Sequence, residues 1–433
     1  MKYILYFLAL TSLAFASHAQ TKSKASSTND PYTRQVQALS KNQLVQNAFS
    51  IIDQLEPTTR KEHIELTQVP APPFKESVRA AHYQKMLAAA GADKVWIDSV
   101  GNVLALRKGK KSTRTVVLDA HLDTVFPEGT DVTVKEKGDT LFAPGIADDT
   151  RGLIAMLTVL RALEKASIET TDDVLFIGTV GEEGLGDLRG VKYIVEKSNL
   201  TIDAWIALDG TAIDQVINGA LGSIRYKVTI TGPGGHSWGA FGIGNPHHAM
   251  AKSINYFSDA ATQFTSTGVK TSFNIGRTGG GTSVNSIPFE SWAEVDMRSE
   301  SPLQLKKIDS IFKLTMKKGV TDYNQKIKQG PSLQLSLQQI GYRPSGATPE
   351  SSPLVQKVFA AARHFSVVPQ LAIVSTNANV PIAHGIPAVT IGAGGKSDHE
   401  HALGEWWLNE KGADGIKFAL LTLLLEAGIE KNK

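Results

Sequence analysis

The stretch "VLFIGTVGEEGLGDLRG", residues 174–190, joins an apolar run to two adjacent glutamates, Glu182 and Glu183. Four apolar residues followed by glycines are typical of a short buried strand and the turn that ends it. Carboxylates at the end of a buried strand lose hydration, so they repel each other or take up protons unless a cation compensates them. The segment therefore predicts a sheet edge that carries a charged site.

Strand and helix patterns alternate on both sides of this segment, which indicates an α/β domain. Further apolar runs that end in polar residues or glycine predict strands at 115–121, 204–210 and 387–395. Apolar residues at helical spacing predict helices at 151–166, with Thr150 as the N-cap, and at 415–428.

The pattern changes between residues 221 and 335. The segments "IRYKVTITG" (224–232) and "SWAEVDMRS" (291–299) alternate apolar and polar residues, as half-buried antiparallel strands do. Helical patterns follow near 247–264 and 302–318. We therefore expect a four-stranded sheet with two helices, inserted into the α/β domain.

The first residues, "MKYILYFLALTSLAFASHAQ", predict a secretory signal peptide over residues 1–19, cleaved after Ala19. Their apolar run is short for a membrane span, and an uncleaved anchor is the alternative interpretation. The chain has no cysteine, which excludes a lipoprotein anchor, disulfides and thiolate metal ligands. Residues 20–45 are polar and predict a flexible leader. We expect an exported protein, periplasmic or secreted, without a stable membrane anchor after cleavage.

The length and charge narrow the class of protein further. A chain of 433 residues is long enough for two domains. Its formal net charge is +3, and the basic and acidic residues are interspersed. Because no basic stripe is present, we expect no nucleic-acid partner.

Histidine and carboxylate residues follow several of the predicted strands. Ligands of open α/β sheets gather at the carboxyl ends of the strands. Imidazole nitrogens and carboxylate oxygens without sulfur suit Zn²⁺ or a similar divalent ion. Individual residues also have other interpretations. Asp119 or Asp149 can simply cap a turn, and His399 is an alternative to His401 as the ligand from their shared loop. The residues expected to converge are His121, Asp123, Asp148, Glu182, Glu183, Asp209 and His401.

Five motifs, in this order, resemble those of the co-catalytic zinc exopeptidases, the family of peptidase T, carboxypeptidase G, acetylornithine deacetylase and succinyl-diaminopimelate desuccinylase. They are "HLDTVFP" (121–127), "APGIADDTRG" (143–152), "GTVGEEG" (178–184), "GPGGHS" (232–237) and "HALGEW" (401–406). The resemblance runs from about Phe74 to the C-terminus. It implies a three-layer α/β catalytic domain built from residues 46–220 and 336–433, with a ferredoxin-like dimerisation or lid domain at 221–335.

The resemblance also implies two divalent metal ions per chain, with zinc as the expected metal, bridged by Asp148. The further ligands that it implies are His121 and Asp209 for one ion, and Glu183 and His401 for the other. His401 is preferred to His399 because the family pattern of His, three residues, Glu and an aromatic continues to Glu405 and Trp406.

Three further residues receive catalytic roles from the resemblance. Asp123 would orient His121, as carboxylates behind a ligating imidazole do. Glu182 would be the general base, passing a proton from the attacking water to the leaving nitrogen. His236 would stabilise the oxyanion, often across a homodimer; on its own, it is also a plausible turn residue beside two glycines.

The resemblance implies substrate contacts as well. Asn285 and Arg298 would hold a substrate carboxylate, since the planar guanidinium of arginine meets a carboxylate with two hydrogen bonds. Asn377 stands where the family loop often has Asp, so the part this loop plays in substrate binding is left open.

These features favour an exported exopeptidase that acts on small peptides, like peptidase T. The carboxylate at this ligand position varies between Glu and Asp in the family, and Asp209 resembles the peptidase T branch. An N-acyl-amino-acid amidohydrolase is the alternative with the same chemistry, because both substrates present an amide and a free carboxylate. A non-catalytic metal-binding protein is the other alternative, and Glu182 argues against it because a binding protein needs no general base.

Overall fold

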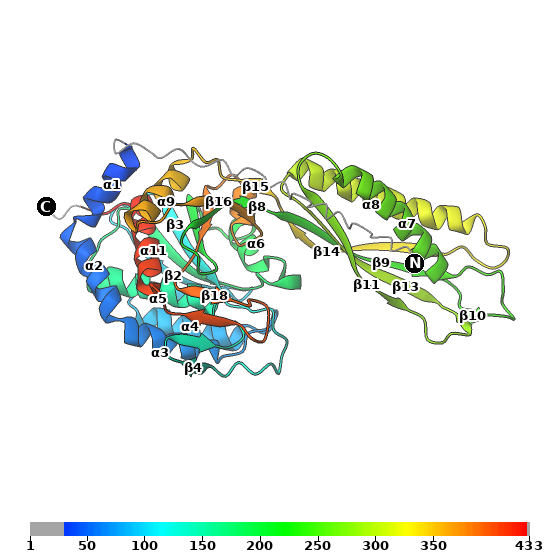
Figure 1. Cartoon of the computed structure of the whole chain (residues 1–433), viewed down its shortest axis with the longest axis horizontal. Coiled ribbons are helices and arrows are strands. Elements are labelled where there is room, and N and C mark those ends of the chain that lie inside the picture. Colours follow the sequence, from blue (N-terminus) through cyan, green and yellow to red (C-terminus); the bar gives the residue numbers. More distant parts are fainter. Residues whose placement is uncertain (1–29, 431–433) are drawn as a thin grey trace, which may run out of the picture.

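The computed structural model describes residues 30–430 and divides into an α/β domain and an insert that extends from it (Figure 1). The α/β domain is built on a nine-stranded sheet in the order β1-β2-β6-β3-β7-β17-β8-β15, with β16 also paired to β8. Strands β6, β3, β7 and β17 run parallel at its centre. The nine strands are β1 (Lys94–Ile97), β2 (Val103–Arg107), β3 (Thr115–His121), β6 (Asp173–Thr179), β7 (Ala204–Leu208), β8 (Gln215–Ala220), β15 (Gly346–Ala347), β16 (Gln370–Val374) and β17 (Ala388–Ile391). The four strands predicted from apolar runs are confirmed.

Helices cover both faces of this sheet. Along β3, Val116 and Leu118 pack into one hydrophobic core while Val117 packs into the other, as the alternation of a strand requires. The first core holds α4 (Ser77–Ala89), α5 (Thr150–Lys165), α9 (Pro353–His364) and α11 (Gly412–Ala427), and the second holds α6 (Arg189–Glu196) and α10 (Asn379–Ala383). The predicted three-layer domain is therefore confirmed. The N-cap of α5 is Asp149 and not Thr150, because the Asp149 carboxylate accepts a hydrogen bond from Gly152 N.

The predicted flexible leader is wrong from residue 31 onwards. Helix α1 (Pro31–Ser40) and the first turn of α2 (Gln43–Gln54) occupy the end of this segment, and α3 (Glu56–Thr67) follows them. Val36 and Val45 are buried in the main core, and Asp30 caps α1 by accepting hydrogen bonds from two backbone N–H groups. The polar residues of this segment lie on the outer faces of amphipathic helices, which explains its polar composition. The predicted signal peptide lies outside the described residues.

A second, four-stranded sheet brings the C-terminal loops close to the loop before α5. Its order is β18-β19-β5-β4, formed by Lys396–Asp398, Trp406–Leu408, Thr140–Phe142 and Lys135–Lys137. Because β19 pairs with β5, the loop at residues 399–405 lies over the loop at 143–149. Within residues 30–430, no helix has both the length and the apolar character needed to cross a membrane.

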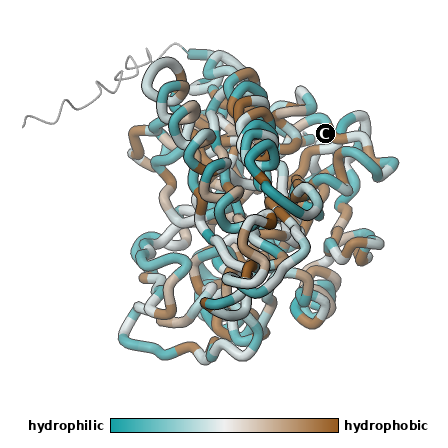
Figure 2. The backbone as a smooth tube through the Cα atoms, turned by 90° about the vertical axis from the view of Figure 1, so that its right-hand side faces the viewer, coloured by the Kyte–Doolittle hydropathy of each residue, from teal (hydrophilic) through white to brown (hydrophobic). Residues whose placement is uncertain are grey.

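The insert has its own antiparallel sheet and its own hydrophobic core. The sheet order is β11-β13-β9-β14, and Figure 1 shows helices α7 and α8 together on one of its faces. These elements are β9 (Gly222–Thr231), α7 (Pro246–Thr265), β11 (Thr271–Gly280), β13 (Glu290–Ser299), α8 (Pro302–Asn324) and β14 (Gln334–Arg343). In Figure 2, which views the molecule from the insert end, hydrophobic and hydrophilic residues alternate along the chain, as in elements with one buried face.

The insert ends later than predicted. Strand β14 pairs with β9 up to Arg343, so the boundary lies near residue 343 and not 335. Leu335 and Leu337 alternate with polar residues, but the register shifts between Gln339 and Gly341, so the alternation breaks before the strand ends. Strands β10 (Gly235–His236) and β12 (Ser286–Ile287) pair at the end of the insert furthest from the α/β domain (Figure 1).

Candidate active site

The predicted ligands lie where the central strands end. His121 is the last residue of β3 and pairs in register with Thr179, the last residue of β6. The two glutamates follow β6 after a short turn, and Asp209 follows β7, where its N–H donates to Ile391 O of β17 at 3.1 Å. The carboxyl ends of the parallel strands thus gather these side chains at one edge of the sheet, as the sequence predicted.

Asp148 lies between two histidines that are far apart in the sequence. Its Oδ1 is 2.9 Å from His121 Nε2, and its Oδ2 is 3.0 Å from His401 Nε2. His401 Nε2 is also 3.1 Å from Glu183 Oε1. Ligand atoms of His121, Asp148 and Glu183 all lie within 4.8 Å of one another. The structure therefore contains a candidate metal site, and His399, with 61% of its side chain exposed and an Asp398 contact at 3.7 Å, does not belong to the cluster.

Two observations show that this cluster fits a cation. Asp148 Oδ1 is buried, and among the described residues it has no hydrogen-bond donor although an imidazole nitrogen lies 2.9 Å away. Burial and the Asp148 carboxylate raise the pKa of Asp209 well above its ordinary value, and burial also raises the pKa of Glu182. A divalent ion among these groups would reverse this tendency and keep the carboxylates ionised.

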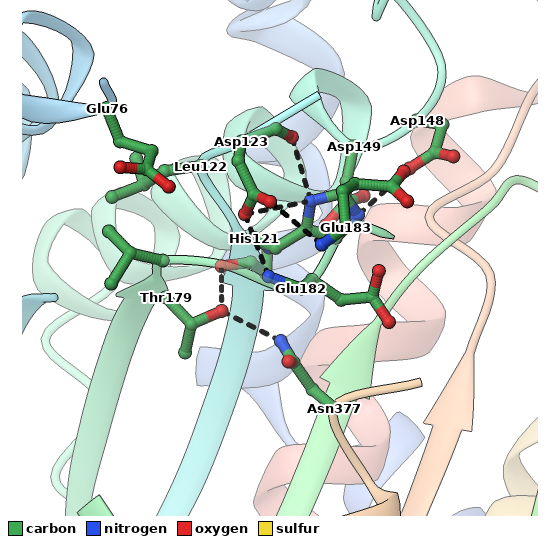
Figure 3. Close-up of polar contacts among 12 residues, drawn as sticks. Glu76, His121, Leu122, Asp123, Asp148, Asp149, Thr179, Glu182, Glu183 and Asn377 are labelled. Carbon is green, nitrogen blue, oxygen red and sulfur yellow. Dashed lines mark hydrogen bonds and ion pairs between the residues drawn. The ribbon is translucent and has the colours of Figure 1, made fainter. Parts of the chain in front are cut away.

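The Asp123 carboxylate lies behind His121, with Oδ1 3.8 Å from Nδ1, but its main chain makes the closer contact with this ring. The ring of His121 contacts the main-chain carbonyl of Asp123, with Nδ1 at 2.9 Å from the oxygen. The carboxylate of Asp123 instead accepts hydrogen bonds from the N–H groups of Glu182 and Glu183, at 3.0 and 2.8 Å (Figure 3). Donation from Nδ1 leaves Nε2 of His121 free to act as a ligand. Asp123 thus orients the imidazole through its backbone and both glutamates through its side chain.

The sequence analysis gave no role in the site to three residues that hold its parts in place: Glu405, Asp149 and Arg343. Glu405, used there only as a motif marker, is buried and accepts hydrogen bonds from Gly145 N, Ala147 N and Asp148 N at 2.7, 2.8 and 3.0 Å. Burial raises its pKa to about 7. Asp149 accepts from His121 N at 2.9 Å while it caps α5.

The third is Arg343, whose Nη1 donates to Glu182 Oε1 at 2.9 Å. Glu405 had a signal in the "HALGEW" motif, and Asp149 had one as a possible cap. Arg343 had none, because its partner lies 161 residues away in the chain.

The predicted oxyanion and substrate residues do not reach the cluster within one chain. His236 and Asn285 lie at the far end of the insert, where Ser237 N donates to Asn285 O at 2.9 Å. Arg298 lies at the other end of β13 and donates to Asp296 at 2.7 Å. The eight residue-to-residue steps of strand from 290 to 298 span roughly 26 Å. Asn285 and Arg298 of the same chain therefore lie too far apart to hold one substrate carboxylate together.

Asn377 lies beneath the sheet edge and is buried. Its Nδ2 donates to Thr179 Oγ1 at 2.8 Å and to Asp119 Oδ2 at 2.5 Å (Figure 3 shows the contact with Thr179). Burial raises the pKa of Asp119 to about 7. Asn377 therefore links the ends of β3 and β6 by hydrogen bonds, and these two contacts use both hydrogens of its amide nitrogen.

Comparisons with known proteins agree with this geometry. The sequence model of Peptidase family M20/M25/M40 matches residues 117–424, which is most of the chain. The chain belongs to the M20/M25/M40 peptidase family. The protein YqjE of Bacillus subtilis is 25% identical over 358 residues, covering 78% of this chain and 91% of YqjE.

Solved structures of the M20 family share the fold. Aminopeptidase PepT of Bacillus cereus superposes with a TM-score of 0.66 at 21% identity, covering 85% of this chain and 97% of PepT. The YXEP protein of Bacillus subtilis, a dinuclear metal binding peptidase of the M20 family, gives a TM-score of 0.62 at 16% identity, covering 87% of this chain and 99% of YXEP. The resemblance, the catalytic domain with an inserted dimerisation domain, and the assignment as a metal-dependent hydrolase of this M20 family are thereby confirmed.

Proposed function

We propose that this M20 enzyme is an exported exopeptidase that hydrolyses small peptides with two metal ions and Glu182 as general base. One observation carries the proposal: the two carboxylate oxygens of Asp148 face two different imidazoles, His121 and His401. A carboxylate in this position suits a bridge between two ions, which lie about 3.5–4 Å apart in two-metal sites.

The residues divide into two ligand sets. Asp148 would serve both ions; His121 and Asp209 would complete one set, and Glu183 and His401 the other. The metals, most simply zinc, would polarise the scissile carbonyl and make water a stronger nucleophile at neutral pH. Asp123 and Glu405 would keep these ligands in place through the backbone contacts described above.

Glu182 would move the proton. Its carboxylate lies next to the ligand cluster but outside it, and Oε1 is held by Arg343 at 2.9 Å. Among the described residues no side chain donates to Oε2, so this oxygen can accept a proton from the attacking water and pass it to the leaving nitrogen.

The choice of a peptide substrate rests on PepT, named an aminopeptidase, which shares the fold, and on the predicted signal peptide, since export favours peptide trimming. The test is turnover of a panel of di- and tripeptides against matched N-acyl amino acids, using metal-loaded mature protein. Preferred cleavage of the peptides supports the proposal. Preferred cleavage of N-acyl amino acids would make the enzyme an amidohydrolase, and metal binding without any turnover would leave a binding protein.

A homodimer would complete the substrate site. Asn285 and Arg298 lie at opposite ends of β13, so both can reach one carboxylate only if they come from different chains. Strand β11 is a free edge of the insert sheet, and antiparallel pairing of two such edges about a two-fold axis would carry the far end of one insert towards the partner's α/β domain. The partner's His236 would then act as oxyanion donor in the first chain's site.

Mixing two inactive variants tests this arrangement. His236→Ala should lower turnover by about a hundredfold or more with little loss of ground-state binding, because oxyanion donors act chiefly on the transition state. When His236→Ala chains are mixed with Glu182→Gln chains, each mixed dimer should regain one intact composite site, which gives about a quarter of wild-type activity after random exchange. A monomer in sedimentation at micromolar concentration, or mixed dimers no more active than their parents, would contradict the composite site.

A further inference from the structure

Arg343 is buried against the residue assigned as general base. It is the last residue of β14, with 5% of its surface exposed. Its Nη1 donates to Glu182 Oε1 at 2.9 Å, and its Nη2 donates to the main-chain carbonyl of the same glutamate. One guanidinium therefore holds both the backbone and the carboxylate of Glu182, and it is the sole side-chain donor to this carboxylate among the described residues.

The same guanidinium is itself fixed by the α/β domain. Its Nη1 also donates to Ser375 Oγ at 3.0 Å, and Ser375 follows β16. Neighbouring residues of the insert contact the same loop as Glu182: Arg225 Nη1 donates to Gly184 O at 2.6 Å, and Tyr342 N donates to Asp187 Oδ1 at 2.8 Å. The base of the insert thus contacts the loop with both glutamates at three points.

We propose that Arg343 is a positioning residue that fixes the Glu182 carboxylate for proton transfer and makes its position depend on the orientation of the insert. The inference rests on the proposed role of Glu182. A glutamate side chain has three rotatable bonds, and a displacement of about 1 Å at a reacting group can cost about a hundredfold in rate. Since β14 belongs to the insert sheet, any rotation of the insert moves the guanidinium and, with it, the carboxylate.

Steady-state kinetics of Arg343→Met and Arg343→Lys test the proposal, with Arg60→Met as the matched control. Arg60 forms a surface ion pair with Glu136 at 2.9 Å, away from the cluster. Arg343→Met should lower kcat about tenfold to a hundredfold and leave KM within about twofold, with metal content retained. Arg343→Lys, which keeps the charge and one donor, should recover part of kcat, and the control should match wild type. A loss confined to KM would make Arg343 a substrate contact and overturn the proposal.

A double variant separates a positioning role from an independent one. If Arg343 acts through Glu182, Glu182→Gln combined with Arg343→Met should be no slower than Glu182→Gln alone; losses that multiply would contradict the inference. The double variant removes both buried charges, so it should fold even if Arg343→Met leaves an uncompensated carboxylate. Wild-type turnover on the substrate panel keeps the two questions apart: an inactive wild type contradicts the proposed function, whereas an active wild type with multiplying losses contradicts this inference alone.

Discussion

Glu182→Gln is expected to lower kcat by about a hundredfold to ten-thousandfold, because glutamine cannot accept the proton that a general base takes up. The metal content should stay near that of wild type, since the candidate ligand atoms belong to His121, Asp148 and Glu183. The amide oxygen of glutamine can still accept the hydrogen bond that Arg343 now donates to Oε1. Turnover of the best peptide of the panel and elemental analysis of the same preparation measure both effects.

Glu183→Gln provides the contrast, because its carboxylate lies 3.1 Å from His401 Nε2 and would be a ligand. This variant should lose metal as well as activity. Glu196→Gln, at a partly exposed glutamate 3.3 Å from His384, is the control and should behave as wild type. If metal leaves with Glu182 while activity survives the loss of Glu183, the two assignments are reversed.

Asp148→Ala is expected to remove both metal ions and, with them, all measurable turnover. Asp148 is the one cluster residue whose two oxygens face both histidines, at 2.9 and 3.0 Å, so its removal would take a ligand from each ion. Elemental analysis after gentle purification should give more than one equivalent of divalent metal for wild type and almost none for the variant.

Asp172→Asn is the matched control for this experiment. Asp172 is also buried, but it pairs with Arg114 at 3.3 Å, remote from the cluster. This variant should keep its metal. A wild-type content that stays at or below one equivalent would contradict the two-ion proposal, and an Asp148→Ala protein that retains one ion would show that Asp148 is not a bridge.

The sequence predicted the centre of the fold well because local patterns determine it. Buried parallel strands appear as apolar runs, so the ends of β3, β6 and β7, and the residues that follow them, could be located without a structure. The ligand types then followed from the chemistry of histidine and carboxylate side chains. The helix at 43–54 was missed although Leu44, Val45, Ala48 and Ile52 follow helical spacing, because the polar residues that precede it were interpreted as one flexible leader up to residue 45.

Long-range contacts account for what the sequence could not supply. Arg343 and Glu182 are 161 residues apart, and Glu405 and Gly145 are 260 apart, so no local spacing reveals either pair. The separation of Asn285 from Arg298 was missed for a different reason. A separation of thirteen residues in the sequence suggests that the two side chains are close in space. Most of these residues form an extended strand, which places the two at opposite ends of the insert.

Glu405 also bears on the order in which the protein can mature. The chain is synthesised from its N-terminus, and domains generally fold as units as they emerge. The loop with Asp148 has three N–H groups whose acceptor, Glu405, is made about 260 residues later. His401 is made at the same late stage, whereas the insert, with its own core, is complete by residue 343. A nascent chain that ends before residue 401 therefore holds a complete insert but lacks His401 and Glu405, so we expect the candidate metal site to form, and to take up metal, only after synthesis is nearly complete.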